Sequence, residues 1–166
     1  MANNVNEVVL RPHRPGDIGW VISQHGEVYS KEYDWDGTFE AFVARIAADF
    51  VLDFNPKSDC CWITERNGER LGASFVVSHP KEDGVCKLRM VIVSSEARGL
   101  GVGRQLVEAC LAFAKDAGYK KMMLWTNDVL KPARKLYQVI GFELIESEPH
   151  HSFGVDLVGE VWSLDL

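Results

Sequence analysis

Three alternating glycines form the segment of this chain that is best suited to chemistry. They lie in Arg98-Gly99-Leu100-Gly101-Val102-Gly103, between an apolar run at residues 88–93 and a stretch of helical spacing at residues 103–117. A strand, a glycine-rich turn and a helix together direct several backbone N–H groups at an anion, and the start of the helix adds a partial positive charge. The first turn of the helix holds Arg104 and no acidic residue, so nothing local repels a phosphate. The segment predicts a site for a phosphorylated cofactor.

The spacing of the glycines excludes two common nucleotide-binding motifs. A P-loop ends in Lys followed by Ser or Thr, and no such pair is present. A dinucleotide fingerprint that began at Gly99 would need glycine at position 104, where this chain has Arg104. Arg98-x-x-Gly101-x-Gly103 instead resembles the acyl-CoA pyrophosphate loop, Q/R-x-x-G-x-G/A, of the GNAT family of N-acetyltransferases.

A second segment carries the same resemblance. Residues 121–126 read as a strand followed by Asn127, and a short helix with Pro132 near its start ends at Gly141. Ala133-x-x-x-Tyr137-x-x-x-Gly141-Phe142 is similar to the A-x-x-x-Y-x-x-x-G-F signature of the GNAT family. Both motifs occur in the family's order, and the resemblance covers nearly the whole chain.

The resemblance implies an acetyl-CoA-dependent N-acetyltransferase, which transfers an acetyl group directly to a primary amine of a small molecule or peptide. In the family the residue that matches Tyr137 is often the general acid, and a phenol with a pKa near 10 stays protonated at neutral pH and can donate to a departing thiolate. The alternative is that Tyr137 only packs on the apolar face of its helix. The resemblance also implies which residues bind acetyl-CoA, the co-substrate: Val91, Ile92, Val93, Arg98, Gly99, Leu100, Gly101, Val102, Gly103, Arg104, Asn127 and Ala133.

Two other functions remain open on the same residues. One is a catalytically silent module that binds or senses acyl-CoA, and the other is a transferase for a longer acyl-CoA. Many relatives place a glutamate on the strand before the glycine loop as general base, whereas this chain reads Lys87-Leu88-Arg89-Met90-Val91 there. Candidate bases elsewhere are Glu27, Glu32, Asp34, Asp128, His150 and His151, and a water relay would need none of them.

The acceptor site is expected around two segments. The aromatic and acidic segment at residues 29–39 could hold a cationic amine, or could anchor a turn between two helices. The adjacent histidines at 150 and 151 fall in a predicted loop, where they could bind substrate or serve the loop's own hydrogen bonds. The predicted acceptor residues are Glu27, Tyr33, Asp34, Trp35, His150 and His151, and no metal site is expected.

Length and composition predict one domain over residues 1–166. The hydrophobic fraction of 46% and the charged fraction of 25% are ordinary for a globular protein. A net charge of −6 with no basic run argues against nucleic acid as the main ligand. No secretory signal and no membrane-spanning apolar run are visible, so we expect a cytoplasmic protein.

A narrower resemblance is to the acetyltransferase half of bacterial proteins that fuse a MarR-type regulator to a GNAT domain. Residues 11–17, 124–128 and 149–154 prompt it. Since the first predicted strand begins almost at Met1, no MarR domain is expected, and any regulatory role would act in trans.

The elements that must position these residues follow from periodicity and turn signals. Helices are expected over residues 18–30, from 38 to about 50, over 103–117 and up to 140, with Asp17 and Thr38 as caps of the first two. Asn67-Gly68 predicts a hairpin between strands at 61–65 and 70–77. Further strands are expected at residues 8–11, 84–93, 121–126, 142–145 and 158–166.

This order, β-α-α-β-β-β-α-β-α-β-β, predicts an α/β protein with a mixed sheet. The resemblance specifies it as the GNAT (acyl-CoA N-acyltransferase) fold, a mixed, mostly antiparallel central sheet of about seven strands flanked by about four helices. The final strand, if exposed, could pair with a second copy in a homodimer. None of the four cysteines forms a C-x-x-C pair, so a structural zinc site is not expected.

Overall fold

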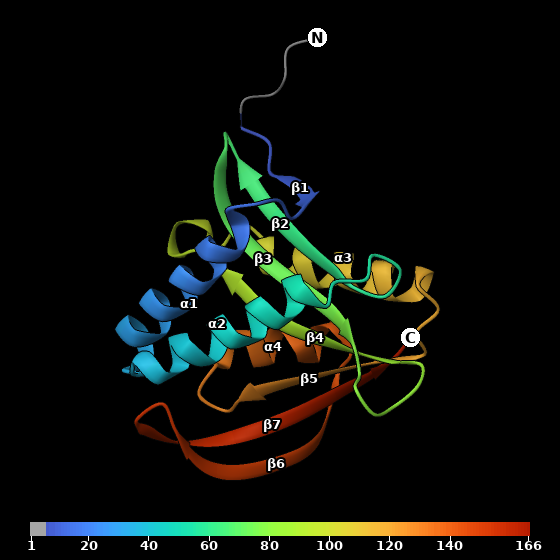
Figure 1. The fold of residues 1–166 in the computed structure, drawn as a ribbon. Helices are drawn as coiled ribbons and strands as arrows, with labels where there is room; N and C mark the ends of the chain where they lie inside the picture. The colour runs from blue at the N-terminus through green and yellow to red at the C-terminus, as the bar shows by residue number, and fades with distance from the viewer. Residues whose placement is uncertain (1–5) are drawn as a thin grey trace.

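The central element is a seven-stranded sheet in the order β1-β2-β3-β4-β5-β7-β6, seen in a computed structural model that describes residues 6–166 (Figure 1). β4 and β5 pair in parallel, and the other neighbouring strands pair antiparallel. The elements in chain order are β1 (Val9–Pro12), α1 (Asp17–Tyr33), α2 (Gly37–Leu52), β2 (Cys60–Arg66), β3 (Glu69–Ser78), β4 (Val85–Val93), the short 3-10 helix η1 (Ser95–Ala97), α3 (Val102–Asp116), β5 (Lys121–Asn127), α4 (Lys131–Ile140), β6 (Glu143–Ser152) and β7 (Val155–Asp165).

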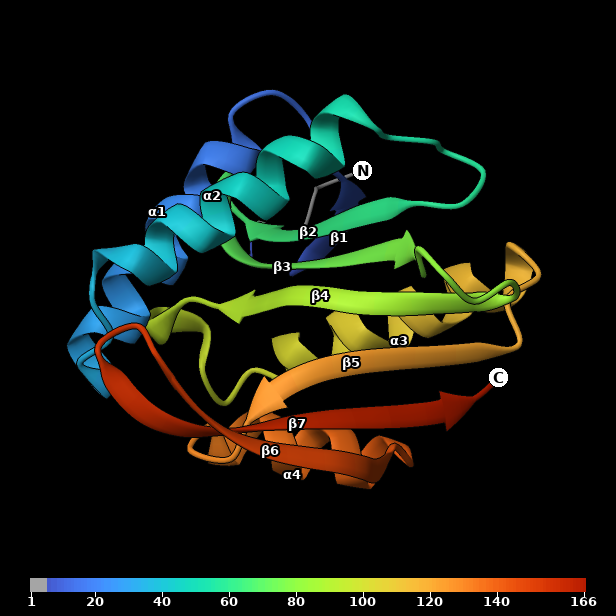
Figure 2. The same cartoon turned by 60° about the horizontal axis from the view of Figure 1, so that its bottom comes forward.

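Helices cover the two faces of the sheet unequally. α1 and α2 lie on one face, over β2 to β4, and α3 and α4 lie on the other (Figure 2). On the first face Val21 and Phe50 pack with Phe75, and on the second Val107 packs with Leu88. β5, β7 and β6 extend beyond α1 and α2, so part of the first face stays open beside these helices.

The predicted fold and order of elements are confirmed, as is the hairpin at residues 67–68. Asn67 and Gly68 both adopt left-handed backbone conformations, with φ of 54° and 79°, as a two-residue turn requires. The predicted helix cap at Thr38 is wrong. The cap is Asp36, whose carboxylate accepts from the backbone N–H of Thr38 at 2.9 Å.

Asp17 is also not the predicted cap. It is the first helical residue of α1, it is fully buried, and Arg11 and Arg70 each bind its carboxylate at 2.7 Å. Burial alone would raise the pKa of Asp17, but hydrogen bonds from Arg11, Arg70 and the N–H of Arg14 hold it well below its ordinary value. Asp17 therefore ties the start of α1 to β1 and β3.

Two expectations about the C-terminal strands are wrong. Residues 149–152 belong to β6 rather than to a loop, and the turn is a two-residue hairpin at Phe153 and Gly154, with φ of 59° and 82°. The final strand, β7, lies between β5 and β6, so the two edge strands of the sheet are β1 and β6. Pro149 suits the β6 edge, because an edge strand needs no donor there.

The four cysteines are buried free thiols. Cys60 and Cys61 lie on opposite faces of β2, as predicted, and Cys110 packs in the core beside Ser74. In residues 6–166 no three His, Cys, Asp or Glu side chains are grouped to hold a metal ion. None of the helices in that range is long and apolar enough to cross a membrane.

Candidate active site

The site begins where β4 and β5 separate. Their parallel pairing runs from Val85 with Lys121 to Leu88 with Leu124, and it ends there although both strands continue. Figure 2 shows the two strands diverging toward their C-terminal ends. The backbone of residues 89–93 is therefore free of a strand partner on the β5 side, and a gap opens in the middle of the sheet.

A bulge in β4 marks the same point. Ala73 of β3 pairs with Ile92 and Phe75 pairs with Arg89, so Ser74 faces two residues, Met90 and Val91. Met90 has a φ of 49°, a left-handed conformation that is costly for a residue with a side chain. The bulge turns this part of β4 toward the gap, where its backbone can meet a ligand.

The glycine loop follows β4 and forms the start of α3. Gly99 and Gly101 have φ of 80° and 75°, which favour glycine, and an added Cβ at either position would meet no atom within 4 Å. Within the described range, the backbone N–H groups of residues 101–104 have no hydrogen-bond partner, as is usual at a helix start. Together they can bind an anion such as a pyrophosphate.

The loop is adjacent to the gap between the strands. A Cβ added at Gly103 would lie 3.5 Å from both Val93 of β4 and Leu136 of α4. The anion site and the gap are therefore neighbours, joined along the end of β4 and the inner side of α4.

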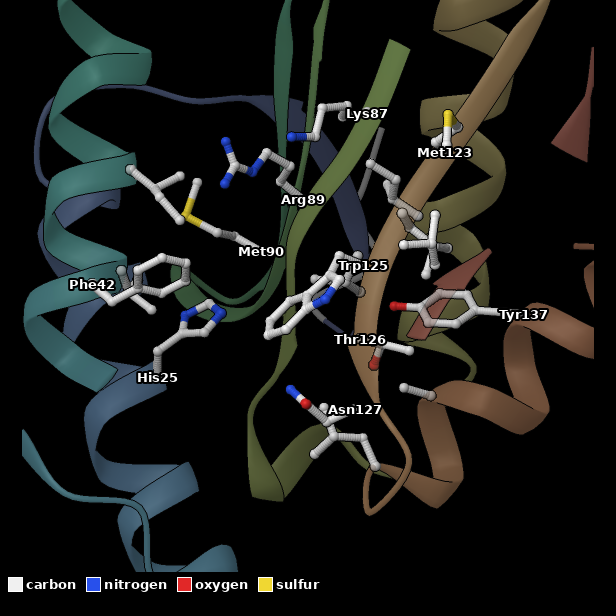
Figure 3. A pocket seen from close by; sticks show the side chains of 18 of the residues that line it. His25, Phe42, Lys87, Arg89, Met90, Met123, Trp125, Thr126, Asn127 and Tyr137 are labelled. Atoms are coloured by element: carbon white, nitrogen blue, oxygen red, sulfur yellow. The ribbon is translucent and has the colours of Figure 1, made fainter. Parts of the chain in front are cut away.

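A cavity of about 470 Å³ occupies the gap on the α1 and α2 face of the sheet. Trp35, in the connection between α1 and α2, and Phe39, Phe42 and Ile46 of α2 provide an apolar wall. β4, β5 and α4 complete it with polar groups that include Arg89, Asn127 and Tyr137 (Figure 3). An apolar pocket with a few converging polar groups is typical of a small-molecule site.

Tyr137 lines the cavity from α4. Its side chain is buried, and in Figure 3 its hydroxyl points toward β5. The hydroxyl forms no hydrogen bond with the described residues, and burial raises the pKa of Tyr137 well above its ordinary value. The phenol therefore stays protonated and has its proton available for a ligand.

Asn127 is held by His150 of β6, the first strand of the β6–β7 hairpin. His150 Nε2 lies 2.8 Å from Asn127 Oδ1, and His150 Nδ1 lies 2.9 Å from the hydroxyl of Ser152. When His150 donates from Nε2, the serine hydroxyl donates to Nδ1, and both contacts are satisfied. The Asn127 amide oxygen is then occupied, and its NH₂ group remains to donate into the cavity.

His25 of α1 is a site residue that the sequence analysis missed. Its Nδ1 lies 2.7 Å from the carbonyl oxygen of Val21, so Nδ1 must carry a proton. Burial lowers the pKa of His25 to about 4, and the ring is neutral at neutral pH. Nε2 therefore carries a lone pair, and it has no partner among residues 6–166, in a ring that lines the cavity.

Five of the predicted site residues meet at this cavity: Trp35, Val91, Asn127, Ala133 and Tyr137. Ile92 and Val93 pack into the core next to it. The two predicted phosphate-binding arginines are engaged elsewhere, since Arg98 pairs with Glu32 of α1 and Arg104 pairs with Glu108 one turn along α3.

The remaining predicted residues lie outside the cavity. Glu27, in α1, and Asp34, directly after it, are both exposed. Tyr33 packs against the rings of Tyr29 and Trp35. His151 is exposed and pairs with Asp156. His150 borders a smaller hollow beside Trp125, and acts on the cavity through Asn127.

Comparison with known proteins agrees with this geometry. The model of the acetyltransferase (GNAT) family matches residues 19–142, so the chain belongs to the GNAT family of acyltransferases. Enzymes of this family use acetyl-CoA as co-substrate.

Three individual proteins illustrate the likeness. An uncharacterised N-acetyltransferase of Schizosaccharomyces pombe is 31% identical over 124 residues, which cover 74% of this chain and 75% of that protein. The mycothiol acetyltransferase of Thermomonospora curvata is 28% identical over 87% of this chain, but the match spans only 49% of that longer protein. An acetyltransferase structure from Salmonella typhimurium with its cofactor acetyl-CoA superposes with a TM-score of 0.77 at 17% identity, covering 96% of this chain and 94% of that one.

Proposed function

We propose that this protein acts as a single domain that transfers the acetyl group of acetyl-CoA directly to a primary amine of a small molecule or peptide. The observation that carries the proposal is the junction of two sites at the gap between β4 and β5. One is the row of free N–H groups at the start of α3, and the other is the cavity that Tyr137 lines. A ligand with a pyrophosphate at one end and a reactive thioester at the other fits both together.

The residues present suit acetyl-CoA. The N–H groups of residues 101–104 would bind the pyrophosphate, and the unpaired backbone of residues 89–93 would bind the pantetheine arm. Arg98 and Arg104 could add charge only by leaving Glu32 and Glu108. When bound, the co-substrate supplies a thioester whose carbonyl carbon the amine attacks.

Three side chains of this chain would serve that attack. The Asn127 amide would donate a hydrogen bond to the carbonyl oxygen, where negative charge develops. The Tyr137 hydroxyl would give its proton to the sulfur as it leaves. His25 Nε2 would accept a hydrogen bond from the neutral amine and so orient the nitrogen lone pair toward the thioester carbon. The proton that the nitrogen loses as the amide forms would replace the one that Tyr137 gave to the sulfur.

The relatives support an amine acceptor without choosing one. Mycothiol acetyltransferase and the N-acetylaspartate synthetases, which share about 30% identity with part of this chain, differ in the compound their names contain. The relation to MarR fusion proteins, and with it a regulatory role in trans, stays a prediction.

The experiment is to measure thiol release from acetyl-CoA by the purified protein against a panel of amines and peptides. Release that depends on one class of acceptor is the expected result. No release from any acceptor, in samples that bind acetyl-CoA, would favour the silent acyl-CoA-binding module. Faster release from butyryl-CoA than from acetyl-CoA would favour a longer acyl donor.

A further inference from the structure

Two positively charged side chains of β4 face the cavity. Lys87 and Arg89 are two residues apart, so both point to the same face of the sheet, whereas Leu88 between them is buried in the core on the α3 side. Both line the cavity. In Figure 3 their charged groups lie next to each other, at the end of the cavity away from Asn127.

These two cations have no partner in residues 6–166. Neither makes an ion pair or a side-chain hydrogen bond there, although other partly buried arginines do: Arg11 and Arg70 bind Asp17, and Arg134 binds Glu160. Two neighbouring cations without an ionic partner are unexpected in a chain of net charge −6.

The surrounding groups do not neutralise the pair. Asp49 of α2 acts on Arg89 only through its charge, without a contact, and Glu146 borders the cavity from β6 but is exposed. Burial lowers the pKa of both cations, and Arg89 lowers the pKa of Lys87 further. The protein therefore holds two like charges together at a cost, which an anion between them would relieve.

We infer that Lys87 and Arg89 bind a carboxylate of the acceptor, so that the acceptor is a small amine that also carries a carboxylate, such as an α-amino acid. This inference rests on the proposed transferase function. The guanidinium of Arg89 offers a planar pair of donors that matches a carboxylate, and the ammonium of Lys87 adds a point charge. The amine is then held toward the side of the cavity with His25, Asn127 and Tyr137.

The test uses pairs of acceptors that differ only in the carboxylate. Thiol release from acetyl-CoA is compared for L-phenylalanine and 2-phenylethylamine, and for L-leucine and 3-methylbutylamine. We expect kcat/KM to be about 10- to 100-fold higher for the amino acid of a pair, the range for charge-assisted hydrogen bonds converted at about 1.4 kcal/mol per factor of ten. The same samples are tested for binding of 3-phenylpropionate, which has the carboxylate but no amine.

Variants then locate the effect. Arg89→Met and Lys87→Met should raise KM for the amino acids about tenfold or more, while kcat/KM for the two amines that lack a carboxylate should not fall. If Arg89→Met proves unstable, Arg89→Lys is the substitute. Because it keeps the charge, it should retain part of the preference for amino acids. Arg45→Met removes an exposed cation of α2 that does not line the cavity, and it should change neither value.

The outcomes separate this inference from the proposed function. Thiol release that is equal for both members of each pair, or a preference that Arg89→Met and Lys87→Met leave intact, would overturn the inference and leave the transferase standing. No release with any acceptor would overturn both. A preference for the amino acids that both variants remove, together with loss of 3-phenylpropionate binding, would support it.

Discussion

The glycine loop and the cavity are neighbours that offer different parts of the chain to a ligand. The loop uses backbone N–H groups of four consecutive residues, and its side chains turn to other partners. The cavity is lined by side chains from seven helices and strands, namely α1, α2, β4, β5, α4, β6 and β7. A backbone site depends on conformation and tolerates changes of side chain, whereas a site made of side chains changes its ligand with each substitution. We therefore expect substitutions in the two regions to impair binding and catalysis in different ways.

Tyr137→Phe should give the largest effect, because Tyr137 lies where the two regions meet. Removal of the hydroxyl removes the proton donor for the thiolate, and general acid catalysis is worth about 10²- to 10⁴-fold in rate. We expect kcat to fall by that range while the affinity for acetyl-CoA, measured by calorimetry, stays the same. An unchanged kcat in a variant that binds acetyl-CoA would show that Tyr137 only packs.

His25 should make the stability of the cavity wall depend on pH. Its pKa is about 4 in the folded protein and about 6.5 unfolded, so the unfolded state binds the proton first as the pH falls. The free energy of unfolding is therefore unaffected by His25 above pH 6.5, and it decreases as the pH falls from 6.5 toward 4. A difference of 2.5 pKa units at 1.36 kcal/mol each corresponds to about 3 kcal/mol.

Denaturant unfolding at several pH values checks this prediction. His25→Leu should abolish that part of the pH dependence, because the other titrating groups are common to both proteins. Identical slopes for the variant and the parent between pH 6.5 and 4 would contradict a neutral, buried His25.

The glycines should separate backbone effects from side-chain effects within the loop. Gly101→Ala forces a side chain into a φ of 75°, which costs about 1–2 kcal/mol, so the loop should change conformation and lose about tenfold in affinity for acetyl-CoA. Gly103→Ala is the matched control, because its Cβ would make ordinary contacts at 3.5 Å. Equal affinities for the two variants would mean that the loop conformation does not matter for binding.

His150→Phe should give the smallest effect, since His150 acts only by holding Asn127. Without the contact to Oδ1, the amide can rotate, and we expect kcat to fall about fivefold, the effect of one lost hydrogen bond of about 1 kcal/mol. In a variant that already carries Asn127→Ala, His150→Phe should cause no further loss of kcat. His151→Gln, at the exposed neighbouring residue, should leave the rate unchanged. Additive losses in the double variant would mean that the two residues act separately.

Most of the fold could be predicted from the sequence because its elements have clear local patterns. α3 has an apolar face and a glycine start, and the β2–β3 hairpin has Asn67-Gly68. β6 has no such pattern, since its residues from Glu143 to Pro149 are all exposed and it is held by pairing with β7. Its full length could not be predicted, because long-range strand pairing leaves no periodic trace in a strand that buries neither face.

The same distinction holds within the site. Tyr137 and Asn127 were predicted because each lies at a fixed place in a local motif. His25 is a single histidine in an amphipathic helix, and only its burial and its contact with Val21 reveal its state. In the sequence, Lys87 and Arg89 are notable only because many relatives have a glutamate on this strand. That both lack an ionic partner could not be predicted, because it depends on elements distant in the chain.

The buried cysteines have a practical consequence for the assay itself. All four thiols are at most 8% exposed, and burial raises the pKa of Cys61 and Cys86, so neither presents a reactive thiolate. A thiol dye that counts released CoA should therefore react slowly with the folded enzyme. The same dye would record unfolding as a delayed signal of four equivalents per chain. One reagent thus reports turnover and the opening of the core on separate time scales.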